Sequence, residues 1–167
     1  MRHRNGRNLI IRVHYISSHG LASNVETLQK LTRRQLDVLR TVRTLETSGR
    51  GVPLKLIASS LRMTPPSALG HLTPLEELGL VERHRGKSRL SSRGRSTLLE
   101  YQRHHRVAET LFGSLGLPPD ASCAAAREID LAISHRTVEE VCRAQQHPAA
   151  CPHGAPIEPC GSSRERR

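Results

Sequence analysis

Three consecutive apolar segments, each ended by glycine or proline, constrain the fold of this chain more than any other feature of its sequence. The first reads LTRRQLDVLRTVRTLETSG, in which Leu39, Val42 and Leu45 recur at helical spacing. Thr32 is placed to cap this helix and Gly49 to end it. This pattern predicts that the segment is an amphipathic helix with one face in a core.

The second segment, PLKLIASSL, predicts a short helix, and the turn RMTPPS separates it from a third. We expect Thr64 to cap the third helix and Gly79 to end it, with a leucine stripe at 69, 72, 75 and 78. Pro74 lies inside this helix, where it removes a backbone hydrogen bond to Gly70 and crowds that carbonyl. We therefore expect a kinked but continuous helix.

The stretch LVERHRGKSRLSS predicts two short strands around Arg85-Gly86-Lys87. Helix, helix, turn, helix and basic hairpin is the order of a winged helix-turn-helix, whose third helix lies in the DNA major groove. Between residues 82 and 106 the sequence has eight Lys or Arg and two Glu. We expect the DNA backbone to lie against this part of the chain.

Composition agrees with a helical, nucleic-acid-binding protein. The 26 Lys and Arg exceed the 15 Asp and Glu, and the net charge of +11 comes almost entirely from arginine, which suits phosphate. Double-stranded DNA is the expected partner, and a merely solvated basic surface is the alternative. Aromatic residues make up 2% of the chain, so the core must be aliphatic, which favours helices.

The four cysteines show no CxxC spacing, and no apolar run reaches the roughly 18 residues of a membrane span. We expect free thiols and a soluble, cytoplasmic protein without a membrane partner. The sequence contains no HExxH motif, nucleophile elbow or glycine-rich phosphate loop. We therefore do not expect an enzyme, although a catalytic metal at His105, Glu109 and Asp130 is conceivable in principle.

After the hairpin, the sequence predicts a long helix from residue 92 to about Gly116, a second one capped by Asp120 or Ser122, and a last one before Pro148. Helices that follow a winged helix usually form a dimer interface that matches a palindromic operator. The expected fold is mainly α. The expected divisions are a basic arm (1–30), a winged helix-turn-helix domain (31–95), a helical metal-binding and dimerisation domain (96–146) and an extended, largely mobile tail (147–167).

The stretch RHHRVAETLF places His105 and Glu109 four residues apart, on one face of the long helix. That spacing suits a divalent metal but also a solvated pair. His104 points about 100° away from His105 and is expected to be exposed.

Four stretches resemble the diphtheria-toxin-repressor and manganese-transport-regulator family of metal-dependent repressors. They are VLRTVRTL, IASSLRMTPPSALGHLTPLEELGLV, HRVAE and HPAACPHGAPI, and the similarity covers residues 35–157. The chain resembles the short, two-domain branch of the family. The resemblance implies a dimeric repressor of metal-homeostasis genes whose metal lies between the first helix and the dimerisation helices.

Carried over by position, the resemblance implies five metal-site residues: Asp37, His105, Glu109, Cys123 and Asp130. Without the thiol this set suits Mn(II) or Fe(II), whereas Cys123 favours Zn(II) or Fe(II).

Arg127 and Leu131 stand where the family has ligands, and neither side chain binds metal. Two hypotheses follow. Either the remaining donors hold the metal, or Arg127 imitates the cation among Asp37, Asp130 and Glu109, so that DNA binding no longer needs metal.

The resemblance also implies DNA contacts at the start of the third helix, at Thr64, Pro66 and Ser67. Gly70 stands where one branch has a base-reading glutamine, and His71 is the next polar candidate. On the hairpin, the candidates for phosphate contact are Arg85, Lys87 and Arg89.

Cys142, Cys151 and Cys160 follow one another at intervals of nine residues, and Cys151 and His153 form a C-P-H sequence. A zinc clip there is one interpretation, and cysteines without a ligand are the other. A thiol that responds to oxidation is a further alternative, in a winged-helix protein that does not respond to metal.

Overall fold

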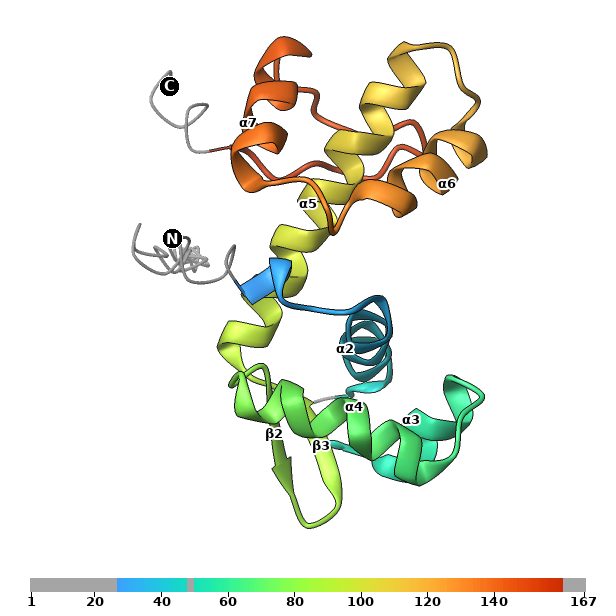
Figure 1. Cartoon of the computed structure of the whole chain (residues 1–167), viewed down its shortest axis with the longest axis vertical. Coiled ribbons are helices and arrows are strands. Elements are labelled where there is room, and N and C mark those ends of the chain that lie inside the picture. The colour runs from blue at the N-terminus through green and yellow to red at the C-terminus, as the bar shows by residue number, and fades with distance from the viewer. Residues whose placement is uncertain (1–26, 48–49, 161–167) are drawn as a thin grey trace, which may run out of the picture.

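The computed structural model describes residues 27–47 and 50–160, which form two lobes joined by one long helix (Figure 1). The winged-helix lobe contains helices α2 (Arg33–Leu45), α3 (Leu54–Ser60) and α4 (Pro65–Glu77), and strands β1 (Val52–Pro53), β2 (Val81–His84) and β3 (Lys87–Leu90). Helix α5 (Ser92–Ser114) leads out of it to a helical lobe with α6 (Pro119–Ile129) and α7 (His135–Ala144). The predicted mainly α architecture is confirmed.

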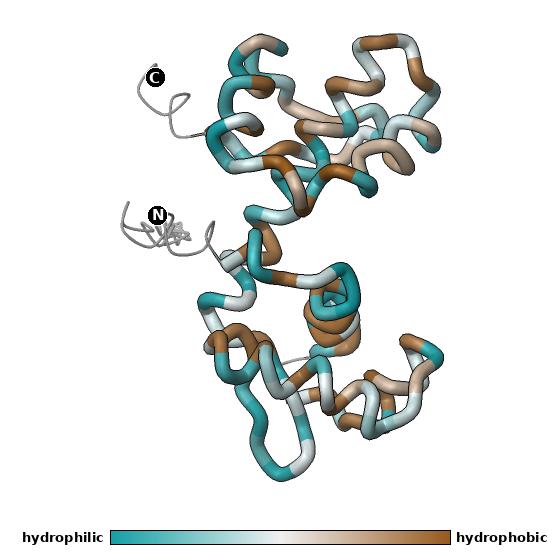
Figure 2. The backbone as a smooth tube through the Cα atoms, in the orientation of Figure 1, coloured by the Kyte–Doolittle hydropathy of each residue, from teal (hydrophilic) through white to brown (hydrophobic). Residues whose placement is uncertain are grey.

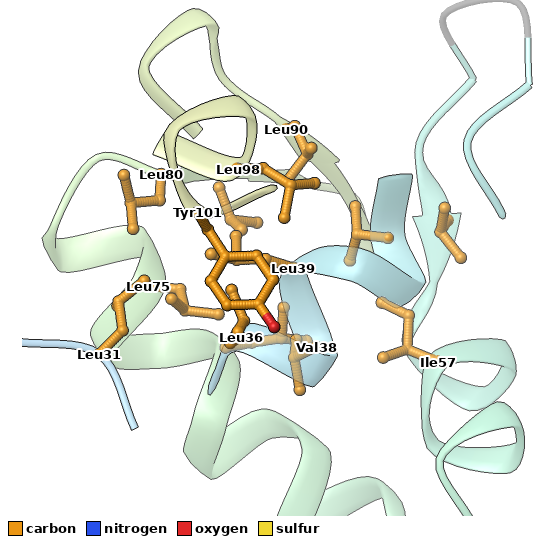
Figure 3. Close-up of a cluster of buried hydrophobic side chains, with 14 of the residues drawn as sticks. Leu31, Leu36, Val38, Leu39, Ile57, Leu75, Leu80, Leu90, Leu98 and Tyr101 are labelled. Carbon is orange, nitrogen blue, oxygen red and sulfur yellow. The ribbon is translucent and has the colours of Figure 1, made fainter. Parts of the chain in front are cut away.

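Helix α2 forms the centre of the first lobe. Thr32 caps it, and Gln35 completes a reciprocal capping box by binding the Thr32 backbone N–H. The helix buries a continuous face that contacts α4 and α5 through an aliphatic core (Figure 3). Tyr101 of α5 adds its ring to this core among Leu36 and Leu39. Helix α2 ends at Leu45, and the expected terminator at residue 49 lies outside the described residues.

Helix α4 begins as predicted, because the Thr64 side chain accepts a hydrogen bond from the Ser67 N–H. The helix continues through Pro74 to Glu77, and Gly79 follows with a left-handed φ of 69°. The kink expected at Pro74 stays a prediction. The buried positions are Ala68, Leu72 and Leu75, whereas Leu69 and Leu78 are half-buried.

The hairpin is also where the sequence places it. Arg85 and Gly86 have φ values of 48° and 72°, so the two-residue connection has positive φ at both positions, as a type I′ turn requires. The strand order is β1-β3-β2, and Val81 of β2 pairs with Leu90 of β3. This hairpin is the wing, and Figure 2 shows it as strongly hydrophilic.

Helix α5 is capped by Ser91 and packs closely on the end of the winged-helix lobe through Gly94. It starts before the expected domain boundary at residue 95, so one rigid element links the two lobes. Helix α6 begins differently from the prediction. Pro118 is its N-cap, Asp120 lies in the first turn, and Ser122 donates instead to the Leu117 carbonyl at 3.1 Å.

Residues 147–160 are packed, so the expectation of a largely mobile tail is wrong for this part. The segment returns across α5 and α7, and Ala150 bridges Pro156 to form a tight loop. Its apolar side chains complete a second core, which consists of Val107, Val138, Cys142, Cys151, Ile157 and Cys160. Residues 161–167 and most of the predicted basic arm (1–26) lie outside the described residues. Within the described part, no helix is long and apolar enough to cross a membrane.

Candidate metal centre and DNA-binding surface

Helices α5 and α6 bring together three of the five predicted metal-site residues. His105 and Glu109 face the same side of α5, with the His105 Nε2 3.8 Å from a Glu109 carboxylate oxygen. Cys123 of α6 places its sulfur 3.5 Å from the same Nε2. One donor atom from each residue lies within 4.8 Å of the other two. We call His105, Glu109 and Cys123 the metal triad.

The triad fits a divalent transition metal by its chemistry. A nitrogen, an oxygen and a sulfur donor converge from two helices, and Glu109 is buried. Burial raises the pKa of the Cys123 thiol, and the charge of Glu109 raises it further. The thiol is therefore protonated at neutral pH, and a metal would have to displace that proton.

Asp130 lies on the other side of His105 and does not face the triad. Its carboxylate is fully buried and contacts the His105 Nδ1 at 3.0 Å, the Tyr101 hydroxyl at 2.8 Å and the Arg33 guanidinium at 2.5 Å. Burial opposes ionisation, but hydrogen bonds from His105, Arg33 and Tyr101 lower the pKa of Asp130 overall. Burial and the charge of Asp130 raise the pKa of Tyr101 to about 12.

These contacts correct the role expected of Asp130. Asp130 is not among the residues whose donor atoms converge at the triad, and both of its oxygens accept hydrogen bonds from other side chains. A carboxylate that accepts the Nδ1–H of a histidine fixes the tautomer with the lone pair on Nε2. Asp130 therefore orients His105 toward Glu109 and Cys123.

Asp37 pairs with an arginine and is not part of the group of donor atoms that forms the triad. The Arg127 guanidinium contacts the Asp37 carboxylate at 3.3 Å, and its side chain is half-exposed. The fixed-charge hypothesis required Arg127 to lie among Asp37, Asp130 and Glu109, but Arg127 forms no ion pair with Asp130 or Glu109. Arg33 pairs with Asp130 instead. Arg33 also donates to the Arg127 carbonyl.

Arg33 and Tyr101 belong to this site although the sequence offered no signal for them. They are 68 residues apart and meet only because α2 packs against α5. Leu131, which replaces an expected ligand, packs instead against the winged-helix core.

The tail supplies two further donors beside the triad. His153 contacts Glu109 through Nδ1 at 2.5 Å and Asp120 through Nε2 at 3.1 Å. Hydrogen bonds to Asp120 and to Glu109 raise the pKa of His153. Glu109, Cys151 and His153 form a second group with donor atoms within 4.8 Å. The C-P-H sequence is therefore part of the surroundings of Glu109.

His104 is buried, contrary to the expectation that it is exposed. Only 1% of it is accessible, and its Nε2 lies 3.0 Å from Glu100 and 3.2 Å from the His135 ring. The helical lobe covers this face of α5 with α7, which periodicity along a single helix cannot reveal. Burial would raise the pKa of Glu100, but hydrogen bonds from His104 and His135 lower it well below its usual range.

The start of α4 presents the predicted DNA-contacting residues to solvent. Thr64, Pro66, Ser67 and Gly70 are exposed, and His71 is half-buried. The Thr64 hydroxyl already accepts a hydrogen bond within the helix cap, so it would approach a phosphate as a donor.

Two of the three predicted wing contacts are available for phosphate. Arg85 and Lys87 are exposed at the tip, and no ion pair among the described residues involves them. Arg89 is exposed but pairs with Glu82 at 2.6 Å. A DNA phosphate would compete with that carboxylate for Arg89.

Several other arginines that were counted toward the DNA surface serve the fold. Arg83 pairs with Glu76, and Arg95 pairs with Glu46. Arg93 and Arg106 donate to backbone carbonyls, and Arg103 is buried beside Glu139. Between residues 82 and 106, fewer cations are therefore free to contact DNA than the charge count suggested, and Arg85 and Lys87 at the tip of the wing are two of them.

Two family models match adjacent parts of the chain. The LexA DNA binding domain matches residues 28–90, and the metal binding and dimerisation domain of the iron dependent repressors matches residues 91–159. The junction coincides with the start of α5. Among curated proteins, none matches the chain.

Solved structures show the same two-lobed arrangement. A hypothetical protein from Sulfolobus solfataricus is 27% identical, with a TM-score of 0.74, and the match covers 77% of this chain and 100% of that one. A manganese-dependent transcriptional repressor in complex with manganese is 30% identical, with a TM-score of 0.61, over 77% of this chain and 59% of its own. IdeR of T. acidophilum shares the fold at 24% identity, with a TM-score of 0.57, over 78% of this chain and 64% of its own.

The chain thus spans about three fifths of the length of the manganese-dependent repressor and of IdeR. It combines, in the same order, a winged-helix DNA-binding domain with the metal-binding and dimerisation domain of the iron dependent repressors. The chain belongs to the diphtheria-toxin-repressor and manganese-transport-regulator family of metal-dependent transcriptional regulators.

Proposed function

We propose that this protein is a metal-responsive transcriptional repressor of metal-homeostasis genes, which binds a palindromic operator as a homodimer. One observation carries the metal response. His105 of the triad contacts Asp130, and Asp130 contacts Arg33 of α2 in the winged-helix lobe. A chain of polar contacts centred on the buried Asp130 thus runs from the metal triad to α2, the helix that packs against α4.

His105, Glu109 and Cys123 would hold the metal, with Cys151 and His153 close enough to add donors on the Glu109 side. A bound divalent cation would hold α5, α6 and the tail at a fixed separation. The thiol donor favours Fe(II) or Zn(II) over Mn(II), because Asp37 and Asp130, the additional carboxylates that would suit Mn(II), are engaged by arginines.

In this proposal α4 enters the major groove and the tip of the wing lies along the backbone. Arg33 keeps α2 attached to α6 whether or not metal is present. Metal at the triad would then fix the orientation of His105 and bias the angle between the lobes, which shifts the population toward the separation of DNA-binding heads that matches the operator.

A metal-independent regulator is the second candidate, and the same ion pairs support it. The Arg33–Asp130 and Arg127–Asp37 pairs join the winged-helix lobe to α6 by fixed positive charges. If these pairs alone set the angle between the lobes, DNA affinity would not change with metal.

Metal titration separates the two candidates. Chelator-treated protein is titrated with Fe(II), Zn(II) or Mn(II), and binding to DNA that it selects from a random-sequence pool is followed by fluorescence anisotropy. We expect metal to raise the affinity at least tenfold and His105→Ala to abolish the increase. An affinity that does not depend on metal would refute the metal response.

Lys87→Ala is the matched control, because Lys87 begins β3 of the wing, which lies at the opposite end of the molecule from α6 (Figure 1). This variant should bind DNA more weakly at every metal concentration and keep the wild-type midpoint of the metal titration. A shifted midpoint would indicate that the titration reports DNA affinity rather than occupancy of the triad.

A further inference from the structure

A further group of side chains that can bind a metal lies in the helical lobe, and it shares no residue with the triad or with the group of Glu109, Cys151 and His153. Cys142 is on α7, His147 follows the end of that helix, and Cys160 is at the end of the packed tail. The His147 Nδ1 lies 3.1 Å from the Cys160 sulfur and 3.7 Å from the Cys142 sulfur. One donor atom from each residue lies within 4.8 Å of the other two.

These separations suit tetrahedral zinc. With Zn–S near 2.3 Å and Zn–N near 2.05 Å, the edges of a tetrahedron are about 3.8 Å between two sulfurs and about 3.6 Å between sulfur and nitrogen. The observed sulfur-to-nitrogen distances of 3.1 and 3.7 Å lie on either side of the second value. The first distance is about 0.5 Å shorter than that edge and the second about 0.1 Å longer, and all three donor atoms lie within 4.8 Å of one another.

The backbone after α7 is shaped so that His147 faces the two thiols. Gln146 and His147 both adopt left-handed φ, 59° and 58°, which costs energy in residues other than glycine. The His147 N–H donates to the Cys142 carbonyl at 2.9 Å, which closes a tight turn. Two consecutive strained residues therefore bring the imidazole of His147 back over Cys142, five positions earlier in the chain.

Without a bound metal, burying Cys142, His147 and Cys160 together is unfavourable. Cys142 and Cys160 are 2% and 3% exposed within the second core, and thiols offer an imidazole only weak hydrogen bonds. Burial raises the pKa of Cys142, although the cation of Arg103 acts in the opposite direction. A metal would replace the weak contacts with three strong bonds and displace the thiol protons.

We propose that Cys142, His147 and Cys160 form a structural zinc site that fastens the tail to α7. Two thiolates and one imidazole are soft donors that select Zn(II) over Mn(II). The site is independent of the triad, with which it shares no residue. Because residues 151–157 contact Glu109 and pack on α5, zinc at this site also holds His153 and Cys151 in place beside the triad.

The test uses the full chain, expressed with zinc in the medium and purified under reducing conditions without chelator. Elemental analysis and native mass spectrometry give the zinc content per chain, and Co(II) substitution gives the thiolate-to-cobalt absorption. We expect Cys160→Ser and His147→Asn each to lose one equivalent of zinc. Because the metal is lost, Cys160→Ser should also lose the thiolate-to-cobalt absorption of this site.

Cys123→Ser is the matched control, because it removes the thiol of the triad and leaves this site intact. It should keep the equivalent of zinc that Cys160→Ser loses. If Cys160→Ser or His147→Asn retains the full wild-type zinc content, or if wild-type protein binds none here, the proposal is wrong. It is also wrong if the intact mass without reductant shows a Cys142–Cys160 disulfide and no zinc.

Folding of the variants is checked by circular dichroism and thermal melting. Should Cys160→Ser fail to fold, His147→Asn and the wild type decide the matter. Chelation must then lower the wild-type Tm by more than it lowers the Tm of His147→Asn, which still has the triad, and an equal response in both proteins would overturn the proposal.

Discussion

Replacing Gly94 by alanine tests how α5 is joined to the winged-helix lobe. Gly94 lies in the first turn of α5, directly against the backbone of Leu80, the residue before β2. A Cβ added there would overlap the Leu80 carbonyl oxygen and lie 2.9 Å from its carbon. The same carbonyl accepts the Ser91 N–H at 3.0 Å, so it cannot move without weakening that hydrogen bond.

The expected cost follows from these contacts. Overpacking against a rigid backbone group costs about 1–3 kcal/mol, and the weakened hydrogen bond about 1 kcal/mol. Alanine returns about 0.5–1 kcal/mol through its better helix propensity. We expect Gly94→Ala to lower the free energy of unfolding by about 2 kcal/mol, and Tm by roughly 4–8 °C for a chain of this size.

Gly70→Ala is the matched control, because Gly70 lies inside α4 and a Cβ there meets nothing within 4 Å among the described residues. The same chemical change should raise the free energy of unfolding by about 0.5–1 kcal/mol. Urea unfolding followed by circular dichroism measures both variants. A Gly94→Ala variant as stable as the wild type, or equal to Gly70→Ala, would refute the close approach at Leu80.

Three further predictions concern electrostatics. Lys87→Ala should weaken binding to all DNA sequences and lower the slope of log affinity against log salt by about 1. Asp130→Asn should lower the free energy of unfolding by about 1–3 kcal/mol, since it leaves the Arg33 guanidinium beside a neutral group; adding Arg33→Gln should cost less than it does alone. The hydrogen bond to Glu100 raises the pKa of His135 above 6.5, so stability should fall as pH rises through that raised pKa, and His135→Asn should lack this fall.

Local signals determined most of the winged-helix lobe. Thr32 and Thr64 cap the helices that they were expected to cap, and Arg85 with Gly86 forms the predicted two-residue turn. These features depend on residues only a few positions apart, so the sequence states them directly. The same holds for His105 and Glu109, which one helix places on one face.

Contacts between distant segments were decided only by the tertiary structure. Periodicity along α5 could not show that α7 covers His104 or that residues 147–160 fold back on the helical lobe. Composition likewise misjudged the tail, because its few apolar side chains have a core to enter only after α5 and α7 have packed.

The sequence by itself therefore determined the architecture, and it supplied candidate DNA-contacting residues and a pair of candidate metal ligands. The tertiary structure decided which partners surround that pair. It placed Cys123 with the pair, turned Asp130 into the group that orients His105, and brought Arg33 across 97 residues of chain to hold it. The physical reason is that helix caps, turns and helix faces depend on residues close together in the chain. An ion pair between distant residues forms only where the packing of two elements brings the two charged side chains together.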